Sequence, residues 1–352
     1  HQHSGNPEFE NLILHAVFHH DVEVEELKDK NIPTLELQNY IDQIVLWKYE
    51  SLLNQNQFIA CENLFSPALI PFNFTEETLI KKLDEKSIAI DESLKFNKNN
   101  YEAVLFQQLA YAFGLKVNAE IFKQLAESLD FSVVNKIRQN QTQLEALFFG
   151  VCGWLEKPED EQMKVWKREF NFLTVKYQLP TLKITPKFSK LRPPNFPTIR
   201  LSQLATLYYL NQNLFSKLVL VKKIDEIKTI FSNVKASDYW NNRFNFGKIS
   251  PVEGEKFLTE EFINIILINT VLPFKYTYHK NSDENISDEI LDFYRTINPE
   301  KNTITENWKS LNVKITNAVE SQAFIYHYKN FCEKKHCLNC SIGYQLLGVK
   351  NL

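Results

Sequence analysis

The sequence lacks the long apolar run that a membrane-spanning helix requires. No window approaches the ~18 uninterrupted apolar residues needed to cross a bilayer. The longest candidate, Phe262–Phe274, is interrupted by Asn264, Asn269 and Pro273. The start of the chain also lacks the basic and apolar regions of a secretory signal. We therefore expect no membrane partner.

The sequence also has little net charge and few cysteines. With 40 Lys and Arg against 43 Asp and Glu the formal net charge is −3, so no global basic field indicates nucleic acid and any such surface has to be local. Five cysteines, an odd number in a long chain without a signal, favour reduced thiols and a cytoplasmic protein. A hydrophobic content of 44% over 352 residues is typical of a globular chain with two or three cores.

The first forty residues differ from the rest. Residue 1 is His rather than Met, so we expect the chain to begin inside a longer protein. Leu12–Phe18 is a short apolar run and Ile32–Leu37 is a second extended piece. Such runs between polar turns favour strands covered on both faces. The sequence therefore predicts a fragment of a small sheet whose other strands are not evident.

Helical periodicity dominates from Ile41 onward. Helices are predicted from Ile41, from Thr75, over 99–113, 118–129, 143–154, 159–177, 201–214, 223–231, 260–276, 288–297 and 318–332. A Pro-rich bridge from Pro180 to Pro197 is the best internal boundary. The predicted fold is mostly α, with helical layers following a small N-terminal α/β fragment with a partial sheet. The expected regions are 1–55, 56–190 and 191–352.

The clearest chemical signal is a cysteine cluster near the C-terminus. Cys332, Cys337 and Cys340 form a C-x4-C-x2-C pattern, and a C-x2-C turn lets two thiolates converge on one ion. A tetrahedral site needs a fourth ligand, for which Cys61 is the best distant candidate. The spacing fits zinc and an iron–sulfur cluster equally. The alternative is that all five are ordinary thiols, as the apolar surroundings of Cys152 indicate for that residue.

Histidines are concentrated at the start of the chain. His15 lies in the first predicted strand, and Glu36 is a carboxylate at the end of the second. Histidine and carboxylate at strand ends would suit metal-assisted hydrolysis, which makes these two the catalytic candidates. His1 and His3 could ligate a metal. The alternative is a hydrogen-bonded His15 in the core and solvated neighbours.

Two basic turns could bind phosphate. Arg192 and Arg200 flank a predicted helix N-terminus, where backbone N–H groups favour anions. Arg243 and Lys248 lie in a second turn that mixes cations with aromatic residues, as single-strand binding surfaces do. These four are the candidate contacts to DNA or RNA. The alternative is an interdomain brace with paired arginines and buried Phe side chains.

The chain resembles a bacterial domain-of-unknown-function family, number 2851. The segments that carry the resemblance are, in order, Ile13–Val17 (ILHAV), Ile32–Leu37 (IPTLEL), Phe113–Asn118 (FGLKVN), Gln143–Leu147 (QLEAL), Arg192–Arg200 (RPPNFPTIR) and Cys337–Gly343 (CLNCSIG). The resemblance implies no established activity.

The resemblance also implies an upstream segment that precedes His1. Members of this family carry there an Asp-containing segment and a Val-Glu-Ile-His segment, similar to the PD-(D/E)XK nuclease pattern. A divalent metal would belong to that segment, and this chain would then lack the catalytic carboxylates. Some nucleases of that superfamily hold an iron–sulfur cluster with one distant and three clustered cysteines, an arrangement similar to Cys61 with Cys332, Cys337 and Cys340.

Three functional hypotheses follow. The first is part of a nuclease-like protein that acts on nucleic acid and carries a Cys-ligated metal or iron–sulfur site. The second is a helical scaffold or interaction protein with a structural zinc site and no catalysis. The third is a redox sensor with exposed Cys337 and Cys340 as the responsive pair. The oligomeric state is left open.

Overall fold

The computed structural model describes residues 11–54, 56–179 and 184–348. His1, His3 and Pro180 lie outside the described residues. The described part is mostly helical, with two sheets of two strands each, which confirms the predicted fold class. In these ranges no helix combines the length and the apolar character that crossing a membrane requires.

Two compact units make up the chain. Unit 1 combines the described residues up to Phe72 with Asn307–Val313 and those from His327 on, and unit 2 comprises Asn73–Glu306 and Lys314–Tyr326. Both sides of the Pro-rich bridge belong to unit 2, so this division does not follow the boundary that we expected at residue 190. The described residues near the two ends of the chain therefore belong to one unit.

Unit 1 is built from short elements. They are β1 (His15–Val17), α1 (Glu25–Asp29), β2 (Thr34–Glu36), α2 (Gln43–Leu53), the 3₁₀ turns η2 (Glu62–Leu64) and η3 (Pro67–Leu69), the π-helical turn η7 (Tyr328–Cys332), the 3₁₀ turn η8 (Cys337–Asn339) and α17 (Ser341–Leu347). Asp42 begins α2 by accepting a hydrogen bond from the Ile44 amide at 2.8 Å. Helix α17 packs against α2 and η8.

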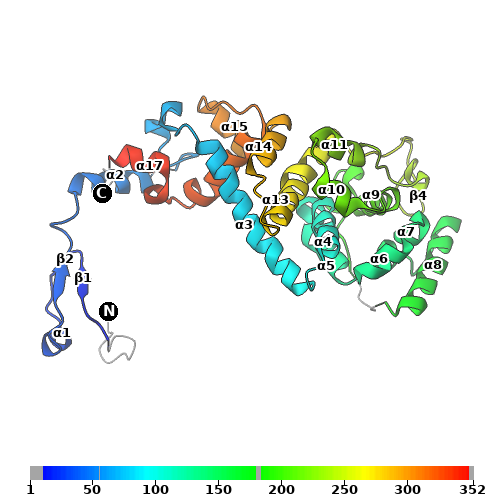
Figure 1. Ribbon diagram of the computed structural model, residues 1–352, viewed down its shortest axis with the longest axis horizontal. Helices are drawn as coiled ribbons and strands as arrows, with labels where there is room; N and C mark the ends of the chain where they lie inside the picture. Colours follow the sequence, from blue (N-terminus) through cyan, green and yellow to red (C-terminus); the bar gives the residue numbers. More distant parts are fainter. Residues whose placement is uncertain (1–10, 55, 180–183, 349–352) are drawn as a thin grey trace. The chain divides into compact units, whose positions relative to one another are not determined.

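The first two strands pair in parallel, and Figure 1 shows β1 and β2 side by side with α1 between them in the chain. In the register His15 lies opposite Thr34, and Val17 lies opposite Glu36. The expected cover on both faces is not seen among the described residues, because Ile13 and Phe18 are 87% and 46% exposed. The strands themselves lie where the apolar runs predicted them.

Unit 2 contains the long helices. They are α3 (Phe74–Phe96), α4 (Tyr101–Phe113), α5 (Leu115–Glu127), α6 (Phe131–Ile137), α7 (Gln141–Val151), α8 (Glu161–Tyr177), η4 (Pro193–Asn195), α9 (Pro197–Leu210), α10 (Leu214–Leu220), α11 (Ile224–Ser232), η5 (Asp238–Trp240), α12 (Glu260–Ile266), the π-helical turn η6 (Leu267–Val271), α13 (Leu272–Lys280), α14 (Ser287–Thr296), α15 (Thr303–Ser310) and α16 (Ala318–His327). A hairpin of β3 (Arg243–Asn245) and β4 (Lys248–Ile249) completes it. The second half of α15 and the last residue of α16, His327, belong to unit 1.

Polar side chains cap several of these helices. Asn100, Asn140, Asp160 and Thr259 accept hydrogen bonds from first-turn amides of α4, α7, α8 and α12, which satisfies donors that have no partner within the helix. The predicted stop at Gly114 is confirmed as the C-cap of α4. α5 begins directly afterwards at Leu115, three residues earlier than predicted.

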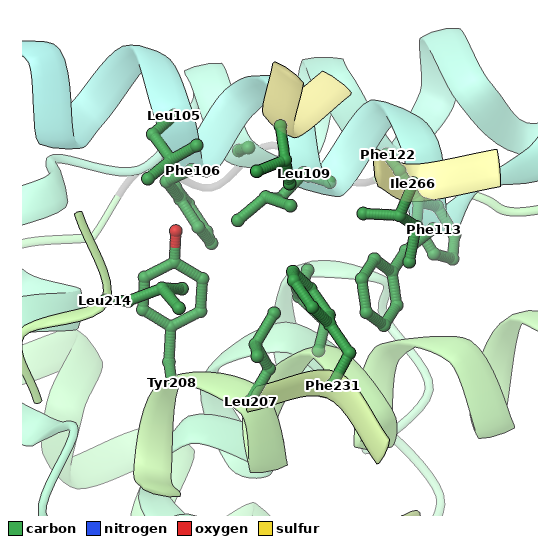
Figure 2. Close-up of a cluster of buried hydrophobic side chains, with 14 of the residues drawn as sticks. Leu105, Phe106, Leu109, Phe113, Phe122, Leu207, Tyr208, Leu214, Phe231 and Ile266 are labelled. Carbon is green, nitrogen blue, oxygen red and sulfur yellow. The ribbon is translucent and has the colours of Figure 1, made fainter. Parts of the chain in front are cut away.

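A continuous apolar core holds unit 2 together. In Figure 2, Phe106 and Leu109 of α4 face Leu207 and Tyr208 of α9. The rings of Phe106 and Tyr208 meet edge to face, with centroids 5.3 Å apart, a favourable geometry for aromatic pairs. Phe231 of α11 closes the same cluster. Helices α4, α9 and α11 therefore share one buried cluster.

Helix α9 is buried nearly all round. At helical spacing Leu201, Leu204 and Tyr208 share one face of this helix, and Arg200 and Gln203 share another. Arg200 and Gln203 are 5% and 1% exposed, so that other face is also covered. A helix enclosed on all sides is a central element of its domain.

Candidate metal centre

Unit 1 brings together the four cysteines that the sequence proposed as metal ligands. Cys61 precedes the turn η2, Cys332 is the last residue of η7, and Cys337 and Cys340 lie at the start and just beyond the end of η8. Cys61, Cys337 and Cys340 are 9%, 7% and 7% exposed, and Cys332 is half-buried. Three separate stretches of chain therefore supply thiols to one unit.

The thiols are close enough to influence one another's ionisation. The pKa of Cys61 is raised to about 12, mainly by burial and then by negative charge on Cys340 and Cys337. The pKa of Cys332 is raised by burial and then by charge on Cys340, Cys61 and Cys337. Like charges disfavour joint ionisation in a buried place. A bound cation would remove this mutual penalty.

The thiols are not already arranged around an ion. Within the described ranges, no group of three or more His, Cys, Asp and Glu side chains has the geometry to hold a metal. The chemistry of the donor set fits a thiophilic metal, because four cysteine sulfurs are the usual complement of a structural zinc site or an iron–sulfur cluster. An incoming ion would have to draw the sulfurs together.

A histidine lies against one of the thiols. His327 Nε2 is 3.3 Å from Cys340 Sγ, and both groups are buried. The His327 side chain is 3% exposed, and burial lowers its pKa to about 4, so the ring is neutral near pH 7. A neutral imidazole can donate one N–H to a sulfur or ligate a metal through an unprotonated nitrogen.

Aromatic rings fix the position of that histidine. The His327 ring stacks on Phe331 with centroids 5.0 Å apart and lies 6.3 Å from Trp308. Phe58, three residues before Cys61, meets Trp308 edge to face at 5.5 Å and stacks on Tyr328 at 4.6 Å. The thiol cluster therefore borders a small aromatic core that joins residues from both ends of the chain.

The turn that carries Cys337 and Cys340 is held tightly. The Gly343 amide donates to Cys340 Sγ at 3.4 Å, which begins α17. A Cβ on Gly343 would lie 2.3 Å from the Cys337 carbonyl oxygen, closer than atoms can approach. Lys335 donates to the Leu53 carbonyl, and its charge lowers the pKa of Cys337, which burial raises more strongly.

The remaining cysteine lies elsewhere. Cys152 is 2% exposed in the core of unit 2, where burial raises its pKa far above the usual value. This is the environment of a packed thiol. All five cysteines are free thiols. The redox hypothesis supposed an exposed Cys337 and Cys340, whereas both are buried.

The catalytic candidates do not meet each other. His15 Nδ1 lies 3.2 Å from the Thr34 hydroxyl, and Glu36 pairs with His19 at 2.7 Å. The His19 ring lowers the pKa of Glu36, mainly through the hydrogen bond. The two candidates share the β1–β2 pair but have different partners, and their catalytic role stays a prediction.

The four candidate cations differ in their surroundings. Arg200 donates to Gln203 at 2.9 Å and to Asn195 at 2.5 Å, and its guanidinium lies 3.8 Å from the centre of the Phe262 ring. Burial lowers its pKa to about 10. The buried Arg200 guanidinium therefore joins α9 to Asn195 and to Phe262 of α12, and it does not face solvent.

The other three cations are more accessible. Arg192 and Lys248 are exposed and Arg243 is half-buried, with its guanidinium 4.6 Å from the Tyr239 ring centre. The Thr198 hydroxyl of α9 donates to the Phe244 carbonyl of β3 at 2.7 Å. This contact places the two basic turns on neighbouring elements.

Two residues of the centre were missed by the sequence reasoning. His327 stands five residues before Cys332, and a histidine so close to a cysteine cluster is a signal that could have been used. Gly343 stands three residues after Cys340 and is required because the chain there passes against the Cys337 carbonyl. The close approach depends on tertiary packing, which spacing alone does not encode.

Comparison with known proteins gives one match. Neither a curated protein nor a solved structure matches the chain. A family described as "Protein of unknown function (DUF2851)" matches residues 1–303. The match includes Cys61 and ends before Cys332, Cys337 and Cys340, so the CLNCSIG segment lies outside it. Since the match covers most of the chain, the protein belongs to the DUF2851 family.

Proposed function

We propose that unit 1 binds one thiophilic metal centre through Cys61, Cys332, Cys337 and Cys340, and that this centre stabilises a helical scaffold. The observation that carries the proposal is the approach of Cys61 to three cysteines more than 270 residues later in the chain. A metal there links the stretch around Cys61 to the C-terminal turns. Such a link acts as folding free energy for a unit of short elements.

The small size of the local core supports a structural role. The elements of unit 1 are mostly one or two turns long, and exposed apolar side chains such as Trp47 and Leu64, 69% and 60% exposed, flank its helices. Small units that bury little apolar surface are commonly stapled by a metal or by disulfides. No disulfide joins the cysteines of the described residues, and a metal is the staple that we propose.

Elemental analysis tests the proposal. Anaerobically purified protein should contain one zinc, or iron with a broad visible absorption if a cluster is bound. Cys61→Ala should lose most of the metal, because a three-thiolate site leaves one coordination position open. Cys152→Ala is the matched control, a buried thiol of unit 2 whose removal should leave the metal content unchanged. Equal metal in Cys61→Ala and wild type, or none in wild type, overturns the proposal.

Nucleic-acid binding by unit 2 is a second candidate function. It is supported by the contact between Thr198 and Phe244, which joins α9, the helix that follows Arg192, to β3, the strand of the hairpin that carries Arg243 and Lys248. Phosphate contacts release counterions, so affinity should fall steeply with salt. Retention on DNA and RNA columns should decrease in the double variant Arg192→Ala Lys248→Ala. Absence of salt-sensitive retention in the wild type would remove this candidate, together with the nuclease-like hypothesis.

A further inference from the structure

Two nitrogen groups lie against one of the four cysteine sulfurs. Cys340 Sγ has two nitrogen neighbours, His327 Nε2 at 3.3 Å and the Gly343 amide at 3.4 Å. Both distances are within the range of N–H···S hydrogen bonds. The amide is a donor by necessity, because a backbone nitrogen carries its proton at all ordinary pH values.

The histidine ring is held for this contact. It is 3% exposed, and it stacks on Phe331 with the ring planes 24° apart. Phe331 stands next to Cys332 in η7, so the same π-helical turn that positions one thiol also orients the ring beside another. π-helical turns are rare in proteins, and those that occur are often found at functional sites.

We infer that His327 is a hydrogen-bond donor to the metal-bound Cys340 sulfur, a positioning residue of the thiolate centre and not one of its ligands. The inference rests on the proposed function. A tetrahedral ion takes four donors and four thiols are present, so the ring nitrogen is left for the sulfur. Hydrogen bonds to thiolate ligands tune a metal centre from outside its coordination shell.

The chemical consequence concerns the charge on the centre. Four thiolates around Zn²⁺ carry a net charge of −2, and the site is largely buried. Each N–H···S bond withdraws charge from its sulfur and offsets part of that excess, as charge-assisted hydrogen bonds do. Because Cys340 has two such nitrogen neighbours, part of the excess charge at its sulfur is offset.

Cobalt substitution tests the inference. In the Co²⁺-loaded full chain, sulfur-to-cobalt charge transfer is observed in the near ultraviolet. A hydrogen bond lowers the energy of the sulfur lone pair, so its loss moves that absorption to longer wavelength. His327→Phe should show this shift and bind Co²⁺ on the order of tenfold more weakly. His327→Gln restores an N–H donor and should return both quantities toward wild type.

His336→Gln is the matched control. His336 is an exposed histidine of the same segment and should change neither quantity. Circular dichroism of each variant establishes that it is folded. If His327→Phe binds Co²⁺ with an unchanged spectrum and affinity, the inference is wrong and the thiolate centre stands. If the visible bands show loss of a nitrogen ligand, His327 is a ligand and the inference is also overturned. If wild type binds no metal, the proposed function fails first.

Discussion

In the core of unit 2, the Ser202 hydroxyl donates a hydrogen bond to the Glu145 carboxylate. Glu145 of α7 is 2% exposed, and Ser202 also accepts from the Ser237 amide at 2.9 Å. Burial raises the pKa of this carboxyl to about 7 and outweighs the hydrogen bond from Ser202, which lowers it. The carboxyl thus joins α7 to α9, and Ser202 extends the link to the Ser237 amide.

The raised pKa predicts that the fold weakens as pH rises. Between pH 4.5 and 7 the folded carboxyl of Glu145 keeps its proton while the unfolded one loses it. The folded state then binds more protons, so the free energy of unfolding decreases with pH in this window, by about 3 kcal/mol in all. Urea unfolding followed by tryptophan fluorescence at pH 4.5 to 8 measures it. Glu145→Gln, which cannot ionise, should lack this pH dependence, and an identical slope in both proteins would refute the assignment.

Arg200 is predicted to stabilise unit 2. Arg200→Ala removes the contact with Phe262 and leaves the Asn195 and Gln203 oxygens without their donor, which should cost about 2–4 kcal/mol. Arg192→Ala, at an exposed neighbour, should stay within about 0.5 kcal/mol of wild type. Thermal unfolding of both variants makes the comparison. Equal stability of the two would mean that the buried contacts contribute little.

The buried Lys275 of α13 is predicted to contribute more to stability than the surface Lys280 of the same helix. The Lys275 ammonium is 3.2 Å from Glu289 and donates to the Val219 and Val221 carbonyls at 2.6 and 3.0 Å. Lys275→Met strands a carboxylate and two carbonyls and should destabilise by about 3 kcal/mol or more. Lys280→Met breaks a surface pair with Asp84 and should cost less than about 1 kcal/mol. Chemical denaturation ranks the two, and the reverse order would contradict this account.

Gly343 is predicted to be essential for the thiol centre. Gly343→Ala would push a methyl group into the Cys337 carbonyl and so displace Cys337 or Cys340. The metal content should fall, with unit 2 unaffected. Ser341→Ala, an exposed change two residues earlier, serves as control. Full metal loading of Gly343→Ala would show that the turn adapts without loss of the centre.

Local patterns predicted much of the fold. The Pro197 start of α9, the Asn100 cap of α4 and the strands around His15 and Thr34 follow from residue type and spacing within a few positions. Such features are encoded by neighbours along the chain. Asn195 is of a residue type that often caps helices, but here it accepts a hydrogen bond from Arg200, and Phe196 takes the cap position of α9.

Long-range packing explains what the sequence did not predict. Arg200 lies against Phe262 of α12, and the buried Glu145 of α7 is bonded to Ser202 of α9. No local pattern distinguishes these two charged side chains from solvated ones. The sequence proposes Cys61 as a partner of the distant trio because a tetrahedral metal site needs a fourth ligand, whatever the sequence separation. That ligand set stays a prediction.

X-ray absorption at the metal edge of the purified protein tests the central claim most directly, because it counts the sulfur atoms bound to the metal. The account predicts a first shell of about four sulfurs at about 2.3 Å for zinc, reduced to three sulfurs and one lighter atom in Cys61→Ser. A shell of oxygen and nitrogen only, or a sulfur count that Cys61→Ser leaves unchanged, would contradict it.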